Sequence, residues 1–94
     1  MKSIIETDSK SCYICGHNRG LEEHHIFFGT ANRRMSEKYG LKVHLCMSCH
    51  KDNKRGVHGQ NKPMDNYLKE KAQRAFEQNH TREEFISVFG KNYL

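Results

Sequence analysis

The chain has 94 residues, of which 35% are hydrophobic and none is tryptophan, so it can form only one domain with a small core. Sixteen Lys and Arg residues against eleven Asp and Glu residues give a formal net charge of +5, which favours a polyanionic partner. No stretch approaches the ~20 apolar residues that cross a bilayer, and the N-terminal residues lack an apolar signal core. We therefore expect a cytoplasmic protein with no membrane partner.

The first half of the chain predicts two short strands. Residues 1–10 are polar and predict a flexible lead-in. Residues 21–28 end in β-branched and aromatic side chains, which favours a strand. Residues 29–40 predict a polar loop with one helical turn. Residues 41–45 alternate apolar and polar side chains, which predicts a second strand, and residues 50–54 can begin a helix.

The last third of the chain predicts two helices that serve as scaffold. Apolar residues recur at three- and four-residue steps over about 63–78, which predicts an amphipathic helix. Thr81 and Glu84 have the spacing of a capping box, which predicts the start of a shorter helix that Gly90 ends. We expect the aromatic residues of this extension, 63–94, to lie in the core.

Four cysteines fall in two C-x-x-C pairs separated by thirty residues: Cys12, Cys15, Cys46 and Cys49. Two such pairs match a structural tetrahedral zinc site with Zn–S distances of about 2.3 Å. A disulfide framework is disfavoured in a reducing compartment, and bound Zn²⁺ would supply the stability that a small core lacks. The second pair with His50 also matches the C-x-x-C-H haem-attachment motif, but haem attachment requires export and leaves the first pair without a role.

Two adjacent histidines, His24 and His25, lie in the first predicted strand. Neighbouring strand residues point to opposite faces, so one imidazole can bind a metal while the other acts on a nearby water. His50 directly follows the last cysteine, where a helix is expected to begin. A zinc ion that joins the strand to this helix would bring His24 and His50 together. The pattern thus predicts a second, reactive metal site.

The order C-x-x-C, L-E-x-H-H-I, loop, V-x-L-C and C-x-x-C-H resembles the zinc-stapled HNH endonucleases over about residues 12–58. The run HHIFFGTANRR…YGLKV and the C-terminal FGKNYL are similar to the small phage-encoded members of that family, which act in the host cytoplasm. The resemblance implies a small α+β fold: a ββα-metal (His-Me finger) core with a structural four-cysteine zinc site and C-terminal helices. It also implies metal-dependent hydrolysis of DNA phosphodiester bonds.

The resemblance assigns roles to the histidines. His25 matches the general base that deprotonates the attacking water, and a neutral imidazole with a pKa of about 6.5 suits that task. His24 and His50 match ligands of a divalent metal that stabilises the scissile phosphate and the leaving 3′ oxygen. The metal would be Mg²⁺, Mn²⁺ or Ni²⁺. Mn²⁺ and Ni²⁺ suit imidazole ligands better than Mg²⁺, which prefers oxygen.

Two positions depart from the family pattern. Leu41 occupies the place of an Asn that orients the base, which leaves the task to a backbone carbonyl, to Asn32 or to no residue. Lys54 stands where the family often has a further metal ligand; His58 is the expected substitute and Asn53 the alternative. Because the orienting Asn is missing, a non-catalytic zinc-stapled module that binds nucleic acid is the alternative function.

Four basic residues in and after the predicted loop are expected to bind DNA phosphates, with salt-dependent affinity: Arg33, Arg34, Lys38 and Lys42. A zinc nucleobase deaminase is excluded, because no Glu stands two residues after His24 or His25 and no Pro precedes Cys46. One ββα site acts on one strand, so double-strand cutting would require a dimer or two sequential events, and we expect a monomer or a weak homodimer.

Overall fold

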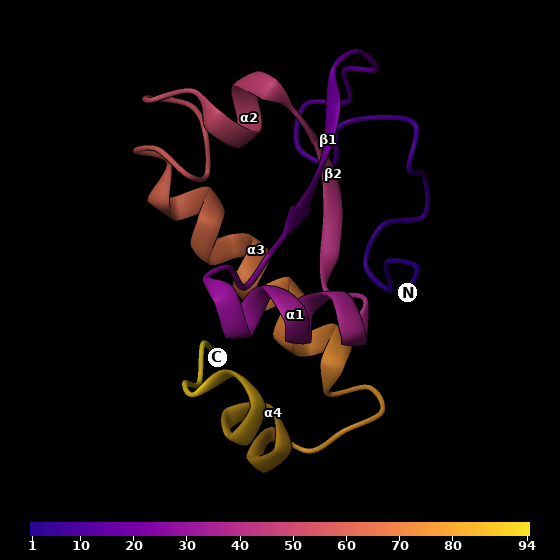
Figure 1. The fold of residues 1–94 in the computed structure, drawn as a ribbon, viewed down its shortest axis with the longest axis vertical. Coiled ribbons are helices and arrows are strands. Elements are labelled where there is room, and N and C mark those ends of the chain that lie inside the picture. The colour runs from indigo at the N-terminus through magenta and orange to yellow at the C-terminus, as the bar shows by residue number, and fades with distance from the viewer.

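A two-stranded antiparallel sheet lies at the centre of the computed structural model, which describes all of residues 1–94 (Figure 1). β1 (Leu21–His25) leads to helix α1 (Thr30–Tyr39), and β2 (Lys42–Cys46) returns beside β1. Helix α2 (Met47–Lys51) follows β2 without a break. The architecture is a small α+β fold, as predicted. β1 begins where predicted but ends at residue 25 instead of 28, and β2 is shifted by one residue from the predicted 41–45.

The register of the sheet separates the two adjacent histidines. His24 lies opposite Val43, whereas His25 lies opposite Lys42. Because side chains alternate along a strand, His24 shares one face with the fully buried Val43 and Leu45. His25 shares the other face with Lys42. The two imidazoles therefore enter different surroundings, although they are neighbours in the chain.

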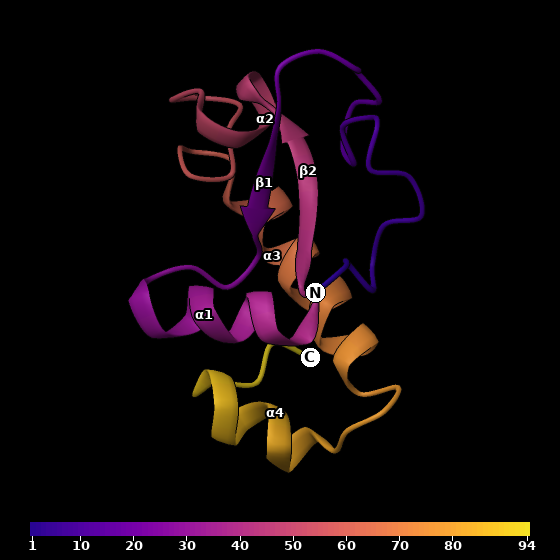
Figure 2. The same ribbon diagram turned by 45° about the vertical axis from the view of Figure 1, so that its right-hand side comes forward.

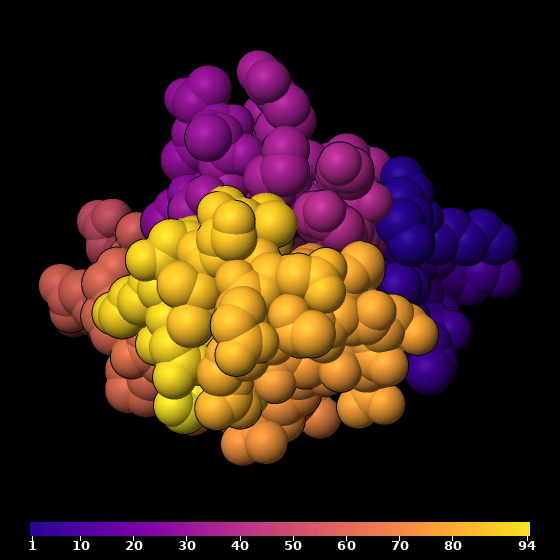
Figure 3. All heavy atoms as spheres, turned by 90° about the horizontal axis from the view of Figure 1, so that it is seen from below, coloured from indigo at the N-terminus to yellow at the C-terminus, as the bar shows by residue number.

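The two predicted C-terminal helices are confirmed. α3 spans Lys62–Phe76, and α4 spans Arg82–Phe89 with a complete capping box between Thr81 and Glu84. Gly90 ends α4 in the left-handed conformation. Viewed from below, the orange and yellow residues of these helices cover one face of the molecule (Figure 3). None of the helices combines the length and hydropathy that crossing a bilayer would require.

Aromatic side chains from α3, α4 and the end of β1 form the main part of the core. The ring of Phe27 lies 5.4 Å from that of Phe85 and 4.5 Å from that of Phe89, and Phe76 packs against Phe85 at 5.4 Å. Phe76, Phe85 and Phe89 are buried, which confirms their predicted place in the core, and Phe27 is buried with them. Tyr67 of the same extension is instead 47% exposed, so the prediction does not hold for that residue. The other buried apolar residues are Ile26, Leu41, Val43, Leu45, Val57, Leu68 and Ala72.

Helix α1 corrects the prediction of a loop over residues 29–40. Only Met35, Ser36 and Tyr39 of this helix are buried or half-buried on its core side, so its apolar periodicity is too weak to indicate a helix. The Arg, Met, Glu and Lys residues of the segment are nonetheless good helix formers. A glycine in the left-handed conformation, φ 71°, ends the helix.

A buried hydroxyl attaches α1 to the end of β1. The Ser36 Oγ accepts a hydrogen bond from the Phe27 amide at 3.1 Å and donates one to the Phe27 carbonyl at 2.9 Å. Both groups are buried, so losing this hydroxyl would leave two backbone groups of Phe27 unpaired. The contact fixes the position of α1, and therefore of the side chains that α1 directs toward the sheet.

Part of the predicted lead-in, residues 1–10, contacts the outer edge of β2. The Ile4 amide donates to the Gly40 carbonyl at 2.9 Å, and the His44 amide donates to the Glu6 carboxylate at 2.9 Å. The His44 Nδ1 also lies 2.6 Å from Glu6. In both ribbon views this indigo segment runs beside β2, on the side away from β1 (Figures 1 and 2). The segment therefore has defined contacts over part of its length.

Candidate functional site

The four cysteines converge at the end of the sheet where β1 begins and β2 ends. Cys12 and Cys15 precede β1, Cys46 ends β2, and Cys49 lies in α2. Their sulfurs all lie within 4.8 Å of one another, and the sulfurs of Cys15 and Cys46 are 3.6 Å apart. Thiolates on one tetrahedral ion at 2.3 Å would lie about 3.8 Å apart. The cluster is therefore compatible with a structural metal site.

The pKa values of these thiols indicate that a bound cation is needed before all four sulfurs can ionise. Burial, together with the sulfurs of Cys46 and Cys15, raises the pKa of Cys49 well above its ordinary value. Burial also opposes ionisation of Cys12, yet hydrogen bonds from the backbone amides of Cys15, Cys46 and Ile14 lower its pKa to about 7. Four thiolates cannot accumulate at this spacing without a compensating charge. A divalent ion would supply that charge and displace the thiol protons, and a donor set of sulfurs alone favours Zn²⁺.

A second cluster consists of three imidazoles. His24 of β1, His50 of α2 and His58 of the following loop have donor nitrogens that all lie within 4.8 Å of one another. Their ring centroids are 4.7 to 4.9 Å apart in each pair. The fold thus brings together the three histidines that the sequence singles out as ligands of a reactive metal.

His24 gives the clearest indication that this cluster fits a metal ion. The residue is 1% exposed, and neither of its ring nitrogens has a hydrogen-bond partner. An unsatisfied buried polar group costs about 1–3 kcal/mol, a cost that coordination to a metal would remove. Burial, followed by the proximity of His50 and His58, lowers the pKa of His24 to about 3. The ring therefore remains in the neutral, metal-binding form across the physiological pH range.

Backbone contacts position His58 beside the other two histidines of this cluster. The His58 amide donates to the carbonyl of His50 at 3.1 Å, so the loop folds over α2. Gly56 permits this path, because a Cβ at that position would lie 2.6 Å from the backbone nitrogen of Asp52. The loop therefore brings a third imidazole to the cluster from a position eight residues beyond His50.

A carboxylate orients the second of the three imidazoles. Glu22 Oε1 lies 3.0 Å from His50 Nδ1, and its other oxygen accepts a hydrogen bond from Lys51 at 3.2 Å. A carboxylate on one ring nitrogen fixes the ring and leaves the other nitrogen for a metal. No motif in the sequence assigns a role to Glu22. The available signal was its position two residues before His24, on the same face of β1.

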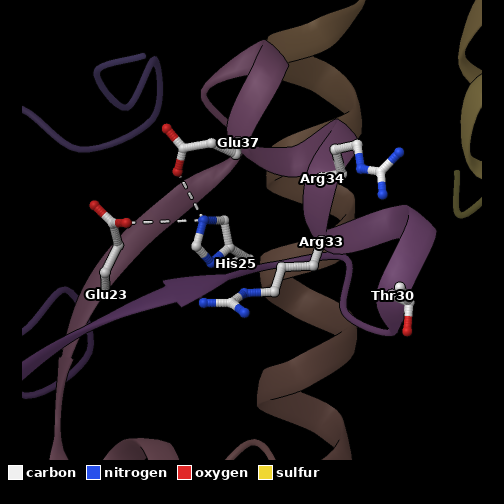
Figure 4. A pocket seen from close by; sticks show the side chains of 6 residues that line it. All are labelled: Glu23, His25, Thr30, Arg33, Arg34 and Glu37. Carbon is white, nitrogen blue, oxygen red and sulfur yellow. Dashed lines mark hydrogen bonds and ion pairs between the residues drawn. The ribbon is translucent and has the colours of Figure 1, made fainter.

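His25 belongs to a different polar cluster, on the opposite face of the sheet. Its Nε2 lies 2.8 Å from Glu37 Oε1 and 3.7 Å from Glu23 Oε1 (Figure 4). The Lys42 ammonium is 3.0 Å from both oxygens of Glu37 and 3.2 Å from Glu23. The α-amino group of Met1, His25 and Lys42 together hold the pKa of Glu37 far below its ordinary value.

These contacts contradict the predicted role of Lys42 as a phosphate-binding residue. Lys42 is 8% exposed, and its ammonium is already paired with two carboxylates. A lysine that occupies such a position neutralises the acidic groups beside it and has no free charge for DNA. The sequence cannot reveal this, because the partners of Lys42 come from β1 and from the unpredicted helix α1.

A groove at the edge of β1 contains residues both from the three-histidine cluster and from the polar cluster around His25. A cavity of about 310 Å³ is lined by residues from both clusters and from α1, among them His25, His50, His58 and Arg33. A neighbouring cavity of about 430 Å³ extends past His25 along α1. A substrate in this groove would lie against His50 and His58 of the three-histidine cluster and against His25 at the same time.

The remaining predicted phosphate contacts lie on α1. Arg33 lines both cavities, and Figure 4 shows its side chain reaching alongside His25. Arg34 lines only the larger cavity and points away from His25 in that view. Lys38 is exposed, lies near the ring of Tyr39 and lines neither cavity. Arg33 is therefore the best-placed cation for a substrate in the groove.

Comparison of the chain with models of protein families, with curated proteins and with solved structures found no match.

We expect Cys15→Ser to remove one ligand from the four-sulfur site and to destabilise the fold. A loss of about 3 kcal/mol would lower the Tm by about 12 °C or more in a domain of this size. Calorimetry and zinc content measured by atomic emission check this outcome. Ser48→Ala, an exposed position between two of the cysteines, is the matched control. An unchanged Tm and full zinc content in Cys15→Ser would contradict the zinc site.

Glu22→Gln is expected to weaken binding of Mn²⁺ or Ni²⁺ to the histidine cluster by about 10–100-fold, because the carboxylate that orients His50 is lost. Titration calorimetry on zinc-loaded protein measures this affinity. Glu70→Gln, an exposed substitution on α3, controls for the loss of one negative charge. Equal affinities for the wild type and Glu22→Gln would show that this carboxylate has no influence on the metal.

Proposed function

We propose that the protein is a metal-dependent endonuclease that hydrolyses phosphodiester bonds in DNA, with an HNH-type ββα-metal core. The observation that carries this proposal is the groove beside β1. There, imidazoles suited to a metal form one wall and a further imidazole, His25, forms another. β1, β2 and then α2, which bears His50, follow the order that the sequence motifs imply, with α1 inserted between the two strands.

His25 is the general base in this proposal. Its Nε2 faces Glu37, and Nδ1 has no hydrogen-bond partner in the protein. A neutral imidazole can accept a proton from water on that nitrogen at near-neutral pH. The side chain is only 10% exposed, so its orientation is fixed by its surroundings before substrate binds.

In this proposal His24, His50 and His58 would hold a divalent cation. His24 offers two unpartnered ring nitrogens, and Glu22 orients His50. When bound, the cation would stabilise negative charge on the scissile phosphate and on the leaving 3′ oxygen. Three nitrogen ligands favour Mn²⁺ or Ni²⁺, whereas Mg²⁺ would depend on oxygen ligands from water and phosphate.

Arg33 and the positive net charge of the chain support a DNA substrate. Arg33 lines the cavity that contains His25 and His50, where it would bind a phosphate next to the scissile bond. A non-catalytic module that binds nucleic acid would use the same arginine. Such a module has no need of three converging imidazoles, two of them buried, or of a further imidazole, His25, with a free nitrogen, which is why we favour catalysis.

We expect the wild-type protein to nick supercoiled plasmid in the presence of Mn²⁺ or Ni²⁺, and His25→Ala to lower the rate by about 10²–10⁴-fold. The affinity for the metal should stay within about twofold, since His25 lies outside the imidazole triad. His17→Ala, an exposed histidine away from the groove, is the control. Wild-type protein that binds DNA but never cuts it with Mg²⁺, Mn²⁺ or Ni²⁺ would instead identify a binding module.

A further inference from the structure

The proposed base requires a partner that fixes its orientation. Leu41 stands at the position where the sequence motifs lead one to expect an orienting Asn, and its apolar side chain is fully buried. Asn32, the substitute suggested by the sequence, makes no side-chain hydrogen bond to His25. The His25 ring makes no hydrogen bond to a backbone carbonyl either, so an orienting group must come from another side chain.

We propose that Glu37 of α1 is the positioning residue for His25: it accepts a hydrogen bond from Nε2–H and so leaves Nδ1 as the basic nitrogen toward the groove. This inference rests on the proposed nuclease function for its catalytic meaning. Glu37 Oε1 lies 2.8 Å from His25 Nε2, which is an ordinary hydrogen-bond distance. Glu23, at 3.7 Å from the same nitrogen, is too distant for a hydrogen bond.

Glu37 is itself held on two sides. The Lys42 ammonium donates to both of its oxygens at 3.0 Å. Its neighbour in the chain, Ser36, attaches α1 to the end of β1 through the two hydrogen bonds to Phe27. Since Lys42 lies opposite His25 in the sheet, both side chains reach Glu37 from the same sheet face. A carboxylate fixed in this way can restrict the imidazole to one orientation.

The positive charge of Lys42 also offsets the negative charges of Glu23 and Glu37, which lie where the substrate phosphate would enter. Glu23 and Glu37 would otherwise repel an incoming phosphate, but the Lys42 ammonium lies 3.0 to 3.2 Å from oxygens of both. Oxygens of these two residues and a nitrogen of His25 are also close enough together to hold a metal ion. We do not assign a metal there, because Lys42 already provides the cation that the two carboxylates require.

The test compares two substitutions of Glu37 with a matched control. Glu37→Ala removes the acceptor and is expected to lower kcat for plasmid nicking about 10²-fold, with KM and Mn²⁺ affinity within about twofold of wild type. Glu37→Gln keeps an acceptor oxygen and should recover at least tenfold of that loss. Glu6→Ala breaks the similar carboxylate–imidazole contact of His44 at 2.6 Å, outside the groove, and should change kcat by less than about twofold.

NMR spectroscopy of protein labelled with ¹⁵N-histidine tests the contact without reference to activity. We expect a slowly exchanging Nε2–H resonance of His25 in the wild type and in Glu37→Gln, and its loss in Glu37→Ala. Retention of that resonance in Glu37→Ala, or an unchanged kcat, would overturn the proposal. If the wild type shows the resonance and yet cuts no DNA, the nuclease function is rejected and the structural contact between Glu37 and His25 stands.

Discussion

The convergence of four thiols at one end of the sheet is the constraint on which the rest of the site depends. Cys12 and Cys15 lie just before β1, and Cys46 and Cys49 bracket the start of α2. Joining these pairs fixes the first strand relative to the helix that carries His50, which directly follows Cys49. In a chain with so small a core, a metal ion held by these cysteines would supply stability that apolar burial alone cannot provide. The distance between His24 and His50 therefore depends on this cluster.

Alternation along β1 then separates two kinds of chemistry. Glu22 and His24 lie on the sheet face that carries the imidazole triad, whereas Glu23 and His25 lie on the face that carries Lys42. His24 and His50 of the triad are buried and His58 is exposed, and neither ring nitrogen of His24 has a hydrogen-bond partner, which suits a metal. The other face is rich in carboxylates and positions a base. Because the sheet has only two strands, both clusters border the edge of β1, where one groove reaches them.

Much of this arrangement is visible in the sequence because local spacing encodes it. The C-x-x-C pairs, the adjacent histidines and the capping box of α4 each place chemistry or structure within a few residues. Helix α1 is different: it turns only Met35, Ser36 and Tyr39 to the core, so hydrophobic periodicity does not reveal it. Its stability comes from helix-forming residues and from a buried hydroxyl contact with Phe27, which depends on tertiary structure.

Three residues acquire their roles only through contacts with distant segments: Lys42, Glu37 and Glu22. Lys42 resembles any surface lysine until α1 places Glu37 beside it, and Glu37 has no evident role until His25 lies within hydrogen-bond distance. Glu22 likewise acquires its partner, His50, only when α2 folds against β1. Motifs in the sequence identify candidate ligands and bases, whereas the groups that orient them come from distant segments.

Anomalous diffraction from crystals of zinc-loaded protein grown with Mn²⁺ tests the central claim most directly. Data collected at the two absorption edges would locate each metal separately. The account predicts zinc among the four sulfurs and a single manganese bonded to His24, His50 and His58. Manganese bound instead at Glu23 and Glu37, or no manganese among the three imidazoles, would contradict it.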